Sequence, residues 1–137
     1  MLSLTMGGCS IGSVSTTTTN AKPPAAKIEL GLYSGRPDPS WVLSVAETAK
    51  LDKLIAELHR VPGQPDQGGL GYRGFMIFER NRTLIAFRGD VAALGAAQSN
   101  HLVDDRRTIE RFLLQSGLVH LSATEIAAVR RGWSIKR

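Results

Sequence analysis

The sequence predicts an α+β domain, in which a small, largely antiparallel sheet packs with about three helices. Three observations lead to this fold class: an alternating segment at residues 27–34, a hairpin pattern at residues 72–87, and two helix starts with capping-box spacing. The predicted order is strand, helix, strand, strand, helix, helix. Because the strands do not alternate regularly with helices, a purely parallel sheet is not expected.

The first strand is predicted over residues 27–34, where Ile28, Leu30 and Leu32 fall on one face. The next segment, residues 34–40, contains two prolines that each push the preceding residue out of the helical region. We therefore expect a stiff turn here, followed by a short extended piece at residues 41–43.

The first helix is predicted to begin after Ser44, because Ser44 and Glu47 have the spacing of a capping box. Its apolar stripe recurs at i, i+3, i+4 and i+7 and comprises Leu51, Leu54, Ile55 and Leu58. The helix should end before Pro62, and residues 62–69 should form a surface loop because they are rich in glycine and proline.

The middle of the chain predicts a β-hairpin with a polar turn at residues 79–82. Its first strand contains Tyr72, Phe75 and Ile77, and its second strand contains Thr83, Ile85 and Phe87. The following segment, residues 89–100, is rich in alanine and glycine. We expect a loop with one helical turn there.

The last third of the sequence predicts two helices. Asp104 or Asp105 is expected to cap the first of them, with Gly117 as its C-terminal stop. Its apolar side comprises Ile109, Phe112 and Leu113, whereas Arg106, Arg107, Glu110 and Arg111 are placed elsewhere on the helix. Ser122 and Glu125 repeat the capping-box spacing, and the final helix ends near Gly132 with Ile126, Val129 and Trp133 facing inward.

The lone cysteine of the chain, Cys9, follows Met6-Gly7-Gly8 and precedes Ser10. Small residues directly before such a cysteine resemble the lipobox of bacterial lipoprotein precursors, in which the thiol receives a diacylglyceryl group. The preceding residues contain no Lys or Arg and are short for a signal peptide, so we expect the true start to lie upstream. The alternative is a disordered cytosolic N-terminus with an incidental cysteine.

The domain organisation follows from this interpretation. Residues 1–9 are a truncated, lipobox-like signal segment, and residues 10–26 form a Ser/Thr/Pro-rich tether whose composition predicts disorder. Residues 27–137 form one globular domain, a length that suits a single core. The lipid-anchored chain would face the periplasm or the outer membrane.

Composition limits the remaining function classes. One cysteine excludes an intrachain disulfide, and no apolar run approaches the roughly 18 residues of a membrane span. Membrane attachment is therefore expected only through lipidated Cys9 or surface charge. The net charge of +5 favours an anionic envelope component or a protein partner, whereas no nucleic-acid-binding motif occurs.

Candidate chemistry in the sequence is sparse, and we expect no cofactor, no metal and no catalytic residue. The string Gly69 to Gly74 matches G-x-G-x-x-G but leads into a predicted strand, which is the wrong context for a dinucleotide site. The histidines His59, His101 and His120 lack metal-ligand spacing.

The candidate binding surface comprises Arg36, Trp41, Tyr72 and Arg73. Arg and Trp in a proline-stiffened loop are residues in which binding energy often concentrates. All four would share one exposed surface if the hairpin pairs with the first strand. The competing interpretation is that Trp41 anchors the loop to the core and that Arg36 pairs locally with a carboxylate.

Three strings carry a resemblance to a known family: Tyr33–Trp41, Leu70–Phe75 and Glu110–Leu114. Together they resemble a family of small, uncharacterised bacterial proteins that includes lipoproteins, over about residues 27 to 121. The resemblance implies a bacterial origin and one domain, and it transfers no activity or site residue.

The sequence thus predicts a cell-envelope lipoprotein that acts by binding rather than by catalysis, with a monomer favoured. One alternative is a small hydrolase-like enzyme, for which a pocket joining Arg36, His101 and Asp104 would argue. The other is a cytosolic basic protein that binds nucleic acid.

Overall fold

The computed structural model describes residues 25–65, 71–95 and 100–134. Within these residues, seven strands form one antiparallel sheet in the order β2-β1-β4-β5-β6-β7-β3. The strands are β1 (Lys27–Leu30), β2 (Ser40–Val42), β3 (His59–Pro62), β4 (Phe75–Phe78), β5 (Thr83–Phe87), β6 (Asp90–Ala93) and β7 (Asn100–Val103). The helices are α1 (Val45–Ala56), α2 (Thr108–Gly117) and α3 (Ala123–Ser134), with a short 3-10 helix, η1 (Leu118–His120), after α2. The predicted α+β class is confirmed.

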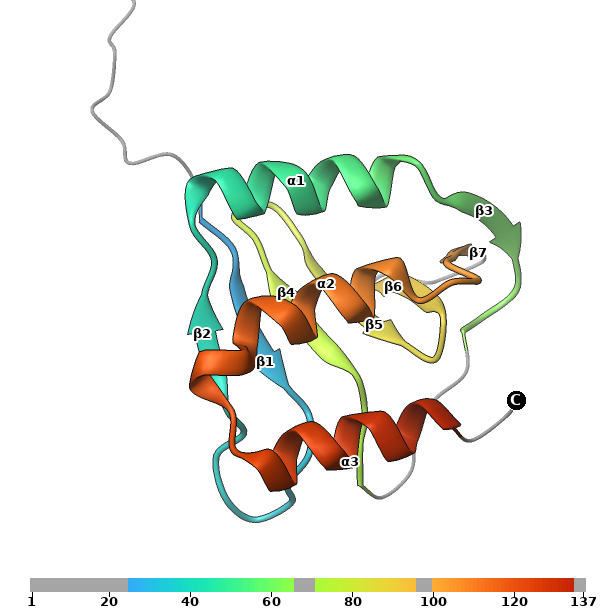
Figure 1. Cartoon of the computed structure of the whole chain (residues 1–137). Helices are drawn as coiled ribbons and strands as arrows, with labels where there is room; N and C mark the ends of the chain where they lie inside the picture. The colour runs from blue at the N-terminus through green and yellow to red at the C-terminus, as the bar shows by residue number, and fades with distance from the viewer. Residues whose placement is uncertain (1–24, 66–70, 96–99, 135–137) are drawn as a thin grey trace, which may run out of the picture.

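All three α-helices lie on the same face of the sheet (Figure 1). The core lies between these two layers, where the alternating residues of β1 and β4 meet the helices. Ile28 pairs with both Trp41 and Ile77 across neighbouring strands, and all three side chains are buried. This pairing confirms that the hairpin lies against the first strand, and it brings the loop after β1 beside the start of β4.

Helix α1 begins with the predicted capping box. Ser44 Oγ accepts from the amide of Glu47 at 3.0 Å, and the Glu47 carboxylate accepts from the amide of Ser44 at 3.0 Å. The helix ends at Ala56, and residues 59–62 then form β3, a strand that the sequence analysis did not predict. Pro62 is compatible with this strand because β3 is at the sheet edge, where a missing N–H breaks no ladder inside the sheet.

The prediction of a loop with one helical turn over residues 89–100 is wrong, because β6 and the start of β7 lie there. Arg88 and Gly89 both have positive φ, 49° and 81°, and they connect β5 directly to β6. Two left-handed residues in a row are typical of the tight hairpin turns that match strand twist. An arginine in the first of these positions is unusual and hides the turn from sequence analysis.

The N-terminal boundary also differs from the prediction. Ala26, which the sequence analysis assigned to the tether, is 1% exposed, and its amide donates to Thr48 Oγ1 at 3.0 Å. The packed domain therefore includes Ala26. Cys9 and the greater part of the predicted tether lie outside the described residues.

Candidate functional site

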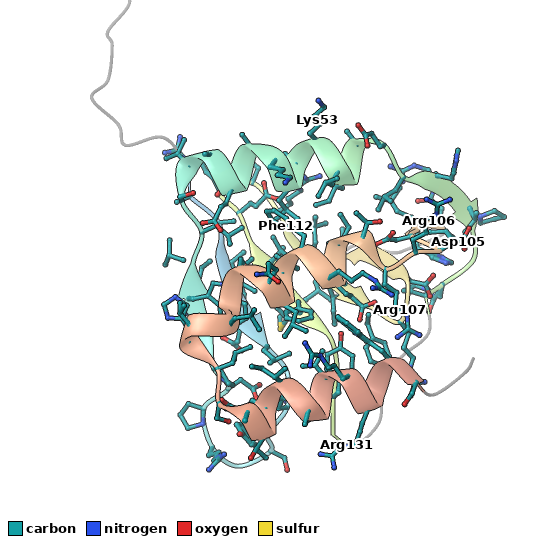
Figure 2. The ribbon with its side chains drawn as sticks, in the orientation of Figure 1. Lys53, Asp105, Arg106, Arg107, Phe112 and Arg131 are labelled. Atoms are coloured by element: carbon teal, nitrogen blue, oxygen red, sulfur yellow. The ribbon has the colours of Figure 1, made fainter. Side chains whose placement is uncertain are left out.

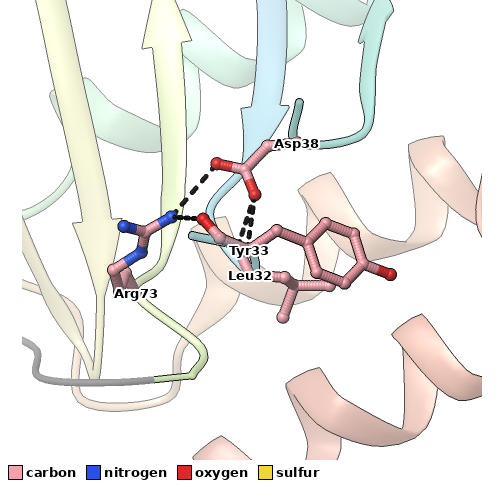
Figure 3. A network of polar contacts seen from close by, with 4 residues as sticks. All are labelled: Leu32, Tyr33, Asp38 and Arg73. Atoms are coloured by element: carbon pink, nitrogen blue, oxygen red, sulfur yellow. Dashed lines mark hydrogen bonds and ion pairs between the residues drawn. The ribbon is translucent and has the colours of Figure 1, made fainter. Parts of the chain in front are cut away.

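The loop between β1 and β2 is fixed from inside by Asp38. Its Oδ1 accepts from the amides of Leu32 at 2.9 Å and Tyr33 at 2.7 Å (Figure 3). By accepting from two backbone N–H groups, the Asp38 side chain satisfies donors that would otherwise pair with a neighbouring strand. The carboxylate therefore holds the start of the loop against its end.

Arg73, which precedes β4, connects the same loop to the start of β4 by hydrogen bonds. Its Nη2 donates to the carbonyl of Tyr33 at 2.7 Å and to Asp38 Oδ2 at 3.2 Å (Figure 3). The Arg73 side chain is 41% exposed, so solvent weakens the ion pair while the backbone contact still positions the loop. The two strings that the sequence analysis singled out thus lie together.

Arg36 lies on the outer side of this loop. Its guanidinium carbon is 3.6 Å from the centroid of the Tyr33 ring, and the Tyr33 hydroxyl donates to Glu125 Oε2 at 2.8 Å. Among the described residues, no carboxylate lies within 4.0 Å of Arg36, so the expected ion pair is not formed in direct contact. The hydrogen bond from the Ser122 amide is the main cause that lowers the pKa of Glu125, the carboxylate that accepts from the Tyr33 hydroxyl, and the nearby charge of Arg36 nevertheless contributes. Arg36 is exposed, which leaves its N–H groups available to a partner.

Trp41 and Tyr72 do not belong to an exposed surface, so the expected exposure of all four residues is wrong for these two. Trp41 is 5% exposed and donates through Nε1 to Ser116 Oγ at 3.0 Å. Tyr72 is 9% exposed because its ring lies against Gly132, where an added Cβ would come within 2.4 Å. The competing interpretation, that Trp41 anchors the loop to the core, is confirmed.

The Tyr72 hydroxyl contacts the buried carboxyl group of Glu110, a residue that the sequence analysis placed away from the apolar side of the helix after Asp104. Glu110 on α2 is 1% exposed and accepts from the Tyr72 hydroxyl, from the Gly89 amide at 2.8 Å and from Trp133 Nε1 at 3.0 Å. Burial raises the pKa of Tyr72 far above its ordinary value, and the negative charge of Glu110 raises it further. The phenol therefore remains a donor at every physiological pH.

The signal for this burial was present in the sequence. Glu110, Leu113, Leu114 and Gly117 recur at i, i+3, i+4 and i+7, and all four are buried. A carboxylate in an apolar stripe needs donors from other elements. Those donors come from three distant segments, so a single sequence does not indicate which residues supply them.

A groove runs between α2 and α3 on the outer side of the helical layer. It encloses about 250 Å³ and is lined by Arg111, Leu114, Gln115, Leu118, Arg130 and Trp133. Arg111, Leu114 and Gln115 on α2 and Leu118 at the start of η1 follow the i, i+3, i+4, i+7 spacing, so they lie along one side. Sequence analysis missed this site because Trp133 was assigned only to core packing and Arg130 was counted only in the net charge.

The residues proposed for a hydrolase site are not brought together. His101 on β7 lies with Nδ1 2.8 Å from the Gly63 carbonyl and Nε2 3.4 Å from Asp90 Oδ1. Asp104 instead accepts from two amides in the first turn of α2, as its predicted capping role requires. Arg36 lies in the β1–β2 loop, toward the opposite edge of the sheet.

The described residues contain no group of three or more His, Cys, Asp or Glu side chains placed to hold a metal ion. No helix among them is both long and apolar enough to cross a bilayer.

Comparisons with protein-family models, with curated proteins and with solved structures found no significant match to this chain.

Proposed function

We propose that the protein is a lipid-anchored binding module of the bacterial cell envelope, and that its β1–β2 loop holds an anionic group of an envelope component. The anchor would be a diacylglyceryl group on Cys9, with the domain facing the periplasm or the outer membrane. In this proposal the protein carries out no catalysis.

The observation that carries the proposal is the exposed cation of Arg36, which lies over the Tyr33 ring and has no carboxylate in direct contact among the described residues. The Tyr33 ring, 3.6 Å away, restricts the guanidinium, and the Asp38 and Arg73 contacts hold the loop beneath it. A cation that is held in place before binding loses less side-chain entropy when it meets a ligand. Glu125 acts on Arg36 only from beyond 4.0 Å, so the exposed N–H groups of Arg36 are available to an external anion that contacts them directly.

The anchoring part of the proposal rests on the Gly7-Gly8-Cys9-Ser10 string and on the polar, proline-containing residues that follow it. A lipidated cysteine with several acyl chains gives stable attachment, whereas a single chain gives only reversible binding. A polar segment between the anchor and the domain would let the loop reach components near the membrane.

Mass spectrometry of the protein from its native membrane fraction, expressed from the full upstream reading frame, tests the anchor. We expect a mature N-terminus at diacylglyceryl-modified Cys9 and loss of the modification in Cys9→Ser. An unmodified Cys9 in the soluble fraction would contradict the anchor.

The binding loop is tested separately in the full chain carrying Cys9→Ser. Its co-sedimentation with phosphatidylglycerol vesicles is compared with that on phosphatidylcholine vesicles, so that an anionic headgroup serves as the probe. We expect Arg36→Gln to weaken binding to the anionic vesicles about threefold to tenfold, whereas Arg80→Gln, an exposed arginine in the β4–β5 turn, changes it little. Equal losses in the two variants would indicate a response to net charge and would refute a role for the loop.

A further inference from the structure

The groove between α2 and α3 contains two guanidinium groups that no described carboxylate neutralises. Arg111 uses Nε to donate to the carbonyl of Arg106 at 3.1 Å, which leaves both of its Nη groups toward solvent. The side chain of Arg130, on α3, has no hydrogen bond or ion pair to any described residue. Two cations from two helices therefore line one concave site.

The remaining wall of the groove is largely apolar. Trp133, Leu114 and Leu118 line it, and the Arg111 guanidinium carbon lies 5.7 Å from the Trp133 ring. Trp133 is held in position because its Nε1 donates to buried Glu110 at 3.0 Å. The indole is thus fixed by the core while part of its ring remains exposed in the groove. A fixed aromatic surface beside two cations fits a ligand with an apolar body and an anionic head.

We infer that this groove binds a small organic phosphate, with the phosphate on Arg111 and Arg130 and its organic group against Trp133. A phosphate is favoured over a carboxylate because its non-bridging oxygens, two in a diester and three in a monoester, are arranged tetrahedrally and can accept from two guanidinium groups that approach from different helices. The volume of about 250 Å³ lies below the roughly 300–1,000 Å³ of pockets for drug-sized ligands. The groove therefore suits a lipid headgroup or a small phosphate ester better than a larger ligand. The site is distinct from the Arg36 loop and does not depend on it.

Phenyl phosphate is the probe for the test, with inorganic phosphate and phenol as its separate halves. The full chain carrying Cys9→Ser is titrated while the Trp133 indole N–H is followed by NMR, with that signal assigned by its loss in Trp133→Phe. We expect phenyl phosphate to bind more tightly than either half and to shift the Trp133 signal. Arg111→Gln and Arg130→Gln should each weaken binding about tenfold.

Arg131→Gln is the matched control, because Arg131 neighbours Arg130 in the sequence but points away from α2 on the outer side of α3 (Figure 2). Arg131→Gln and Arg36→Gln should bind phenyl phosphate as the parent does. Failure of the Arg36 proposal therefore leaves this result unchanged. Equal weakening by Arg131→Gln and Arg130→Gln, or equal affinity for phenyl phosphate and inorganic phosphate, would overturn the inference.

Vesicle binding then identifies the source of the phosphate. If Arg130→Gln also weakens binding to phosphatidylglycerol vesicles relative to Arg131→Gln, the site takes a lipid headgroup. If it weakens phenyl phosphate binding alone, the site takes a soluble phosphate ester. Both results support an organic phosphate site, whereas the absence of any shift at Trp133 contradicts it.

Discussion

Glu110 is the residue whose replacement should reveal most about how the helical layer is held to the sheet. Its carboxyl group is 1% exposed and receives donors from the β5–β6 turn, from the segment before β4 and from α3. Glu110→Ala removes the common acceptor of all three. The Gly89 amide and the Tyr72 hydroxyl would then lose their acceptor, and the Trp133 indole would keep only the Tyr72 hydroxyl oxygen, 3.3 Å from its Nε1.

The expected loss in the free energy of unfolding follows from the number of buried donors that Glu110→Ala leaves without this acceptor. A buried donor without a partner costs about 1–3 kcal/mol, and the half-buried Trp133 can regain part of that cost from water. We therefore expect Glu110→Ala to lower the free energy of unfolding by about 3–5 kcal/mol, a large fraction of the stability of a typical domain. Glu110→Gln keeps one acceptor oxygen and should lose about 1–2 kcal/mol.

Urea unfolding followed by tryptophan fluorescence measures both losses. Gln115→Ala provides the control, because this exposed residue lies on the same helix and changes helix propensity without touching the buried cluster. A loss below about 1 kcal/mol in Glu110→Ala would refute the reasoning, since it would mean that the three donors find other partners at little cost.

Three further predictions concern other contacts of the fold. Gly117→Ala would place a Cβ 2.4 Å from Trp41 Cζ2, so it should lower stability by about 1–3 kcal/mol and alter the near-UV circular dichroism of Trp41. Asp104→Ala removes the acceptor of two amides at 2.9 and 2.7 Å in the first turn of α2, and chemical denaturation should show a loss of about 1–2 kcal/mol. The hydrogen bond from the Ser122 amide lowers the pKa of Glu125 below its ordinary value of 4.5. Because the pKa is lower in the folded state, the resulting stabilisation is present above the unfolded pKa and is lost as pH falls through the folded pKa. Thermal unfolding should thus show wild type more stable than Glu125→Gln at neutral pH, with the difference shrinking below about pH 4.5.

The sequence predicted elements well where a local pattern coincides with tertiary packing. The capping box at Ser44 and the repeated Ser122–Glu125 spacing are both formed, because they depend on residues only three positions apart. Asp104 also accepts from the first turn of α2, although Arg107, and not Asp104, is the residue that directly precedes the helix. Local hydrogen bonding therefore fixed these helix starts.

Prediction failed where an element depends on distant partners. β3 and β7 pair with each other across a separation of about 40 residues in sequence, and neither has the alternating pattern of an isolated strand. Trp41 resembles an exposed binding residue because it follows the proline-stiffened loop that contains Arg36, and Tyr72 does so because it precedes Arg73. Gly117 and Gly132 provide the flat helix surfaces that bury these two aromatic rings. The α2–α3 groove was missed for the same reason, since Arg111 and Arg130 meet only in three dimensions.

The strand order has a consequence for how the chain can fold during synthesis. β1, β2, α1 and β3 leave the ribosome first, yet β1 and β3 are separated in the finished sheet by β4 to β7. Among the described strands, β3 pairs only with β7, which ends at Val103. An emerging N-terminal half therefore holds β3 without its partner and α1 with only the β1–β2 pair to cover, so it gains little from early collapse. We expect the domain to fold as one late event, after the α2 and α3 residues have been added.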